Sequence, residues 1–299
     1  MKNQLLKIIG LFLSLLIFLF VDLNEDSIYR MQVAGNSNAY NFNSIRLIFS
    51  EPLPLLIASS LKIIGLSNPI FFQLTLYLII LLILSIILKK RMYLFPIMLG
   101  LPSVYLLSFN IQPMMISILV IYYILDIESS RNIKLINYKK DLNLFVLALL
   151  FHWSSLFFLP YILIRAKCYK VLFFLGLGSL YAYINFIILD DISVKLISYS
   201  QATISNSSIL HVYTSILMAI FFISCNIFFR KNNKTLQSKN YQYFFLILIS
   251  VLIVNFAGFK AGSRFIFIVD LFLILDFIKH WWPSRIIGTK IYFNKSLWI

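Results

Sequence analysis

The chain has 299 residues, of which 61% are hydrophobic and 12% charged, and its 26 Lys and Arg against 11 Asp and Glu give a formal net charge of +15. The apolar residues form long runs, which indicates an integral membrane protein and excludes a soluble domain of ordinary size. The positive charge does not indicate nucleic-acid binding, because Lys and Arg gather in short loops at the ends of the runs, where they orient a membrane protein and contact lipid headgroups.

About 20 apolar residues are needed to cross the hydrocarbon core of a bilayer, and ten apolar runs are candidates. In chain order they cover residues 4–21, 52–66, 69–88, 92–108, 111–127, 142–164, 171–189, 212–229, 243–259 and 265–282. The first run resembles a signal peptide but lacks a small-x-small cleavage site, so we expect a retained signal anchor. The sequence therefore predicts an all-α polytopic membrane protein of about 8–10 transmembrane helices, with residues 1–299 forming a single membrane domain.

Basic clusters between the runs set the expected topology, because short cytoplasmic loops collect Lys and Arg. These clusters lie at 89–91, 131–140, 165–170, 230–239 and in the tail from 279 to 295. We expect all of them inside, and the acid-bearing loops 22–51 and 190–211 outside. Ten strictly alternating crossings would place 89–91 outside, so two of the runs are expected not to cross.

The two exceptions are the runs at 52–66 and 142–164. The first is short and begins with Pro52 and Pro54, which favours a re-entrant or surface-lying helix on the outer side. The second contains the interruption "FHWSS", which favours two half-helices that enter and return, with His152 reached from the inner face. A plain ten-helix bundle is the alternative.

Ionisable residues inside apolar runs are rare enough to count as candidate functional residues. His152 is either hydrogen-bonded to a neighbouring helix or part of a site. Asp270, in the last run, needs water or a partner from another helix, such as Lys62 or His152. Asp276 shares a helix face with Lys279 and His280, which is typical of an anchor near the inner surface.

Lys260 and Arg264 lie in the segment "GFKAGSR", which we expect to be a Gly-rich turn on the outer side. They either pair with acidic residues of the first outer loop or form a cationic seat for an anionic ligand, a role that Arg serves well through its fixed fork of donors. The sequence contains no cofactor motif, and the isolated Cys168 and Cys225 do not form a metal site.

Five segments together resemble the EpsG-type, Wzy-like polymerases of bacterial O-antigen and capsule polysaccharides. They begin with the acidic and aromatic loop "DLNEDSIYRMQ" and the run "EPLPLLIASSLKIIGLSNPIFFQLTLYLIILLILSIIL", continue with "SFNIQPMMISILVIYYIL" and "LALLFHWSSLFFLP", and end with "GSRFIFIVDLFLIL". The most specific is the block from Phe151 to Leu156. The family usually carries an Asn-x-x-Arg-Gln-x-x-Ala motif, and this chain has Gln112 and Pro113 there without the arginine.

The resemblance implies a GT-C-like architecture and a multi-pass protein of the bacterial inner membrane. It implies a glycosyltransferase that polymerises undecaprenyl-diphosphate-linked oligosaccharide repeat units at the periplasmic face, as in the synthesis of lipopolysaccharide, without a cofactor or a metal. The implied partners are these lipid-linked oligosaccharides, membrane lipids and a chain-length regulator protein, and they do not include nucleic acid.

The residues offer groups suited to that chemistry, which needs stabilisation of diphosphate charge and deprotonation of an acceptor hydroxyl. The candidate catalytic residues are Arg264 for the diphosphate and Asp26, Glu51 or His152 for the proton. The candidate substrate-binding residues are Lys260, Tyr29, Gln112 and Asp270. If His152 lies too deep, we expect it to be a structural hinge of the cavity wall.

Two other functions are compatible with the sequence. A flippase for lipid-linked oligosaccharides would explain a charged cavity without a base, although the chain lacks the internal repeat that transporters often show. A membrane-bound O-acyltransferase would also use a histidine in an apolar stretch, although those chains are usually longer and carry a second polar partner.

Overall fold

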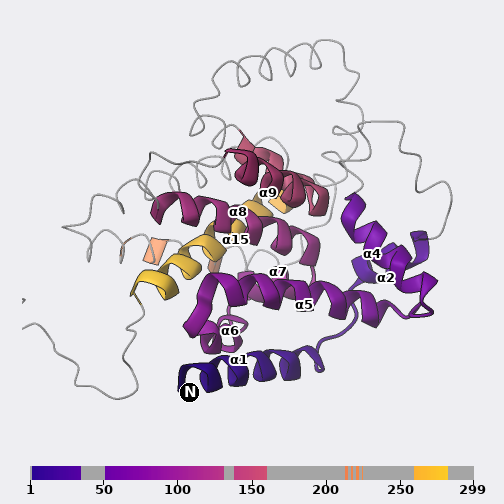
Figure 1. Cartoon of the computed structure of the whole chain (residues 1–299), viewed down its shortest axis with the longest axis horizontal. Helices are drawn as coiled ribbons and strands as arrows, with labels where there is room; N and C mark the ends of the chain where they lie inside the picture. The colour runs from indigo at the N-terminus through magenta and orange to yellow at the C-terminus, as the bar shows by residue number, and fades with distance from the viewer. Residues whose placement is uncertain are drawn as a thin grey trace, which may run out of the picture.

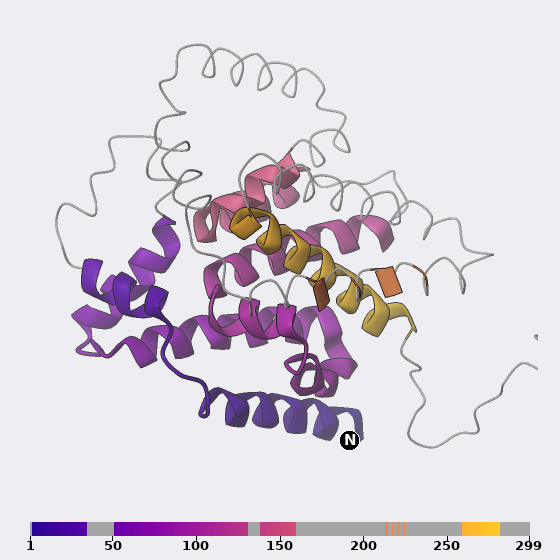
Figure 2. The same ribbon diagram turned by 180° about the vertical axis from the view of Figure 1, so that it is seen from behind.

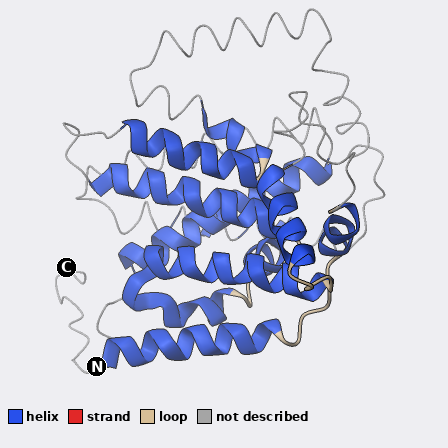
Figure 3. Ribbon diagram, turned by 45° about the vertical axis from the view of Figure 1, so that its right-hand side comes forward, coloured by secondary structure: helices blue, strands red, loops and turns tan. Residues whose placement is uncertain are grey.

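The computed structural model describes residues 2–34, 51–130, 138–159 and 259–281, together with Tyr213, Thr214, Leu217, Ile220, Phe221 and Ser224. The expected run at 171–189, nearly all of those at 212–229 and 243–259, and the outer loop 190–211 lie outside the described residues. Every regular element within the described ranges is helical (Figure 3), which confirms the all-α prediction for this part of the chain.

The helices follow one another through short connections. In chain order they are α1 (Lys2–Phe18), α2 (Glu25–Val33), α4 (Pro52–Ile63), α5 (Pro69–Leu88), the 3₁₀-helix η2 (Lys89–Leu94), α6 (Phe95–Met98), α7 (Pro102–Phe109), α8 (Gln112–Ser130), α9 (Tyr138–Phe151), the 3₁₀-helix η3 (Trp153–Phe158), α15 (Phe259–Asp276) and the π-helical turn η4 (Phe277–Trp281). Helices α1, α5, α8 and α9 are stacked in roughly parallel layers, and α15 runs obliquely to them (Figures 1 and 2). The short helices α2 and α4 contact each other at the end where α5 begins.

Local sequence signals explain where the helices begin and break. Asn68 accepts a hydrogen bond from Ile70 N, and Pro69 occupies the first turn of α5, where a missing N–H costs nothing. The run at 92–108 was expected to be one helix. This expectation is wrong, because the chain divides there into η2, α6 and α7. Pro96 is the second residue of α6 and Pro102 is the first residue of α7.

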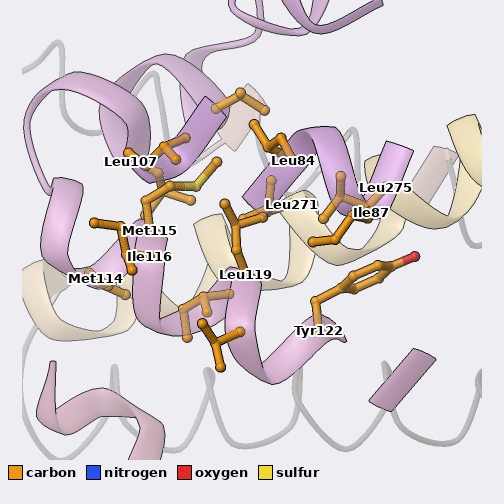
Figure 4. Close-up of a cluster of buried hydrophobic side chains, with 14 of the residues drawn as sticks. Leu84, Ile87, Leu107, Met114, Met115, Ile116, Leu119, Tyr122, Leu271 and Leu275 are labelled. Atoms are coloured by element: carbon orange, nitrogen blue, oxygen red, sulfur yellow. The ribbon is translucent and has the colours of Figure 1, made fainter. Parts of the chain in front are cut away.

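Apolar side chains from α5, α7, α8 and α15 form the centre of the core (Figure 4). The figure labels Leu84, Ile87, Leu107, Met114, Met115, Ile116, Leu119, Tyr122, Leu271 and Leu275. All of them are buried, and most are fully buried. Helix α15 is therefore packed against helices that lie far from it in the sequence.

The outer surfaces of several helices are also apolar. On α1, Leu5, Ile8 and Phe12 are about 60% exposed, and on α5 Leu82 is 62% exposed. Large apolar side chains exposed along successive helix turns are unusual on a soluble monomer.

Within the described residues, a single helical stretch, Pro69–Met98, is long and apolar enough to cross a membrane. A second is obtained if Pro102–Asn110 and Gln112–Leu125, which meet at 114°, form one broken span. The helices Gln4–Phe18, Pro52–Ile63 and Asp141–Phe151 are apolar but shorter. The short α4 agrees with the expectation that the 52–66 run does not span by itself.

The basic cluster at 89–91 lies beside the end of α15. The Arg91 guanidinium donates hydrogen bonds to the carbonyl oxygens of Ile278 and Lys279. A cation at this position is favourable, because the carbonyls at a helix C-terminus carry partial negative charge. The residues around 89–91 and 279, both expected inside, therefore share one end of the molecule.

Asp276 does not serve as a surface anchor. Its side chain is completely buried, and a carboxylate oxygen accepts a hydrogen bond of 2.6 Å from the Tyr122 hydroxyl. The shared helix face with Lys279 and His280 could not reveal this, because the partner comes from α8.

Candidate functional site

The candidate site is centred on the carboxylate of Glu51, at the opposite end of the helices from Arg91. One oxygen, Oε2, accepts a hydrogen bond from the Arg30 guanidinium, and the other, Oε1, lies 3.0 Å from His152 Nε2. The side chains of Glu51 and His152 are only 8% and 7% exposed. Residues from α2, from the start of α4 and from the end of α9 thus meet in one buried polar cluster, which we call the Glu51 cluster: Asp26, Arg30, Glu51 and His152.

Arg30 joins two carboxylates. Its Nε lies 2.9 Å from Asp26 Oδ2, one helical turn earlier in α2, while another guanidinium nitrogen contacts Glu51. Burial by itself would lower the pKa of Arg30, but the attraction of Glu51 and Asp26 outweighs this, and the pKa is raised above its ordinary value. Arg30 therefore remains a cation at any physiological pH.

The backbone of Glu51 adopts a left-handed conformation, with φ 57° and ψ 71°. A residue other than glycine in this region costs about 1–3 kcal/mol, and such residues are concentrated at functional sites. Pro52 follows directly and disfavours the ordinary α conformation for Glu51. The two contacts of its carboxylate help to hold the residue in this conformation.

The His152 ring acts as a hydrogen-bond donor to Glu51. Helix α9 ends at Phe151, and His152 caps η3 by accepting a hydrogen bond of 3.1 Å from Ser154 N at Nδ1. Because a backbone N–H can only donate, Nδ1 carries the lone pair and the ring proton lies on Nε2, which faces Glu51 Oε1. The ring nitrogen that could accept a proton is therefore occupied.

The serines beside His152 stabilise the same break in the chain. Ser154 Oγ lies 2.8 Å from His152 Nδ1, and Ser155 Oγ donates to His152 O at 3.1 Å. Ser117 Oγ on α8 also reaches His152 O, at 3.4 Å. The break predicted from "FHWSS" is present, and its polar groups are satisfied locally and by α8.

The expectation that His152 is reached from the inner face is not compatible with the expectation that Glu51 lies on the outer side. His152 contacts Glu51, which belongs to the acid-bearing loop expected outside, so the two residues lie at the same level. The reason is that α9 is continuous from Tyr138 to Phe151 and carries His152 to the end where α2 and α4 lie. The first of the two expected half-helices is thus a continuous helix, α9, which ends at Phe151.

Arg264 lies near the Glu51 cluster, and its charge acts on the His152 ring. The residue belongs to α15, which begins at Phe259, so the expected Gly-rich turn at Lys260 and Arg264 is instead the start of a helix. The side chain of Lys260 lies outside the described residues. Arg264 is partly buried.

The remaining predicted residues lie around the cluster or apart from it. Tyr29 is 63% exposed on α2. Gln112 is buried at the start of α8, where its Nε2 donates to Gln73 O at 3.1 Å. Asp270 is completely buried in α15, and the structure gives its two suggested partners other contacts, since Lys62 donates to Ala34 O and His152 faces Glu51.

Arg30 was missed by the sequence analysis. A detectable signal was present, because Asp26 and Arg30 are four residues apart in "EDSIYR", a spacing that pairs opposite charges on a helix. Its contact with Glu51 was not detectable, because residues 35–50 separate the two helices in the sequence.

The arrangement supplies two carboxylates held by one arginine, an imidazole fixed as a donor and a second arginine nearby. Within the described ranges, no group of three or more His, Cys, Asp or Glu side chains could hold a metal ion. Comparison with known proteins found no matching family model, no matching curated protein and no matching solved structure.

Proposed function

We propose that this chain is an integral membrane glycosyltransferase that polymerises polyprenyl-diphosphate-linked oligosaccharide repeat units at the outer face of the bacterial inner membrane. The observation that carries the proposal is the Glu51 cluster, in which a buried carboxylate joins Arg30 to His152, with Arg264 close by. The family resemblance of the sequence supplies the reaction class.

Two features of the described helices support a membrane location. Large apolar side chains are exposed along α1 and α5, as expected of surfaces that face lipid. The basic residues around Arg91 and Lys279 share one end, while the acidic residues Asp26 and Glu51 share the other. The loop cluster around Arg91 agrees with the tendency of basic residues to remain on the cytoplasmic side, while Arg30 and Arg264 at the other end belong to the site itself.

The reaction would join an acceptor hydroxyl oxygen to the anomeric carbon of the donor sugar, while the bond from that carbon to the diphosphate oxygen breaks. The leaving diphosphate carries the negative charge away on its lipid, and the acceptor proton passes to a base. Arg264 would stabilise the diphosphate charge, since a guanidinium presents several donors to phosphate oxygens. Lys260, on the same helix, would assist it.

Asp26 is the most suitable proton acceptor in the Glu51 cluster. The lone pair of His152 is occupied by Ser154 N, and both oxygens of Glu51 are engaged by Arg30 and His152. The side chain of Asp26 is 40% exposed and is oriented by Arg30. In this proposal Glu51 and His152 hold Arg30 and Asp26 in place, and the exposed ring of Tyr29 contacts a sugar.

The proposal is tested in cells that lack the chain and carry either the wild-type protein or a variant. We expect cells without the chain to display single repeat units, and Arg264→Ala to shorten the glycan at an unchanged protein level. Lys90→Ala, which removes an exposed charge at the opposite end, is the matched control and should leave the glycan at full length.

Three other outcomes would contradict the proposal. An unchanged glycan ladder in the deletion strain would exclude polymerisation. Complete loss of exported units would indicate a flippase, and full-length chains without acyl groups would indicate an acyltransferase.

A further inference from the structure

Three amide side chains link the start of α2 to α5, α7 and α8, outside the Glu51 cluster: Asn24, which is partly buried, and Gln73 and Gln112, which are buried. The side-chain oxygen of Asn24 caps α2 by accepting a hydrogen bond of 2.6 Å from Ser27 N. The Asn24 side-chain nitrogen donates to Phe109 O, at the end of α7. The residue that starts α2 is thus attached to a helix far from it in the sequence.

Gln73, on α5, holds the chain on both sides of Leu23. Its Oε1 accepts a hydrogen bond of 3.2 Å from Asn24 N, and its Nε2 donates to Asp22 O, also at 3.2 Å. The side chain is 1% exposed. A buried amide that satisfies two backbone groups of a loop determines the position of that loop closely, because each lost bond would leave an unpaired polar group.

Gln112 extends the connection to α8. Its Nε2 donates to Gln73 O, and its Oε1 is buried without a hydrogen-bond partner among the described residues. A buried polar atom without a partner is unfavourable. The hydrogen bond from Nε2 to Gln73 O is therefore the contact that explains why this position carries an amide. Ser117, further along α8, contacts His152 O.

We propose that Asn24, Gln73 and Gln112 are positioning residues that hold α2 so that Arg30 reaches Glu51. They form a continuous path from the N-terminus of α2 through α5 to α8, and α8 also contacts the backbone of His152. Arg30 and His152, on the two sides of the Glu51 cluster, are therefore both connected to α8: Arg30 through α2 and α5, and His152 through its own backbone carbonyl. The consequence for glycan synthesis rests on the proposed function, but the positioning itself does not.

A double-mutant cycle measures this relationship without any substrate. The apparent unfolding temperature of the purified full-length protein is compared for Arg30→Met, Gln73→Met and the double variant. If Gln73 positions Arg30, the double variant loses less than the sum of the two single losses, because Arg30 no longer pairs fully with Glu51 once Gln73 is changed. Additive losses would overturn the proposal.

The matched control is Thr75→Val on the same helix. Thr75 Oγ1 bonds only one turn back, to Phe71 O, among the contacts that the structure gives for it, and the helix is exposed there. The decrease in unfolding temperature caused by Thr75→Val should add to the decrease caused by Arg30→Met. Coupling of Arg30 with Thr75 equal to that with Gln73 would show a general loosening of α5 and would overturn the proposal.

Hydrogen exchange provides a second measurement, for use if Gln73→Met folds poorly. Gln73→Glu keeps an acceptor for Asn24 N but removes the donor to Asp22 O. We expect faster exchange of the amides of α2, with no change in α9. Unchanged exchange in α2 would contradict positioning by Gln73.

The glycan assay separates the two proposals. Coupling together with shortened glycans in Gln73→Met supports both. Coupling with full-length glycans in both Gln73→Met and Arg30→Met supports the positioning role and refutes the part that the Glu51 cluster plays in the proposed function. Absence of coupling refutes the positioning role whatever the glycan length.

Discussion

The hydroxyl of Tyr122 donates a hydrogen bond of 2.6 Å to a carboxylate oxygen of Asp276, and both residues are buried between α8 and α15. This contact fastens the C-terminal half of α15 to the core, while Arg91 holds the turn that follows. The other end of α15 carries Arg264. The position of that arginine near the Glu51 cluster therefore depends on contacts at the far end of the helix.

Tyr122→Phe should lower the free energy of unfolding by about 1.5–3 kcal/mol, the contribution of a hydrogen bond to a charged group. The ring would still pack against Phe272, so the loss reports the hydroxyl alone. Tyr105→Phe, at a position that is 39% exposed, is the control. Equal losses for the two variants in thermal or denaturant unfolding would show that the Tyr122 bond does not stabilise α15.

Glu51→Gln should destabilise the protein and shorten the glycan. Removing one partner of a buried ion pair costs about 3–5 kcal/mol, and we expect the lower part of this range because Asp26 continues to neutralise Arg30. The control is Glu25→Gln, an exposed glutamate on α2 whose change should have little effect. If Glu51→Gln has wild-type stability and wild-type glycan length, the ion pair between Arg30 and Glu51 neither stabilises the protein nor contributes to the site.

His152→Gln should retain much more polymer than His152→Ala. The amide of glutamine can donate a hydrogen bond to Glu51 but cannot act as a base, so it reproduces the role that the geometry gives to Nε2. The lengths of the glycan chains in complemented cells provide the measurement. If both variants abolish polymerisation equally at normal protein levels, His152 has a role beyond donation to Glu51.

Gly10→Ala should destabilise the contact between α1 and η2. A Cβ at this position would lie 2.5 Å from Tyr93 Cα and 2.7 Å from Met92 O, and these backbone atoms cannot move aside easily. Overpacking of this kind costs about 1–3 kcal/mol. Ile9→Ala, at a position that is 42% exposed, is the control. An unfolding temperature for Gly10→Ala equal to that of the control would show that α1 is free to shift.

The sequence alone determined the helical character of the described part, the start of α5 at Asn68 and Pro69, and the break at His152. These features depend on local chemistry: long apolar runs, capping side chains and prolines act on the nearest few residues. Asp26, Glu51 and His152 were candidate residues for a different reason: they could accept a proton in the reaction that the resemblance implies, and His152 is also ionisable within an apolar run.

Only the tertiary structure decided which of these residues meet. Glu51 faces His152 because α9 runs unbroken to the end where α4 begins, and Arg30 joins them because buried amides of α5 and α8 hold the start of α2. The spacing of Asp276 from Lys279 and His280 predicts an anchor near the inner surface, whereas the residue is buried and accepts a hydrogen bond from Tyr122 of α8. Contacts between distant segments depend on how whole helices pack, and the pattern of residues within any single segment does not contain that information.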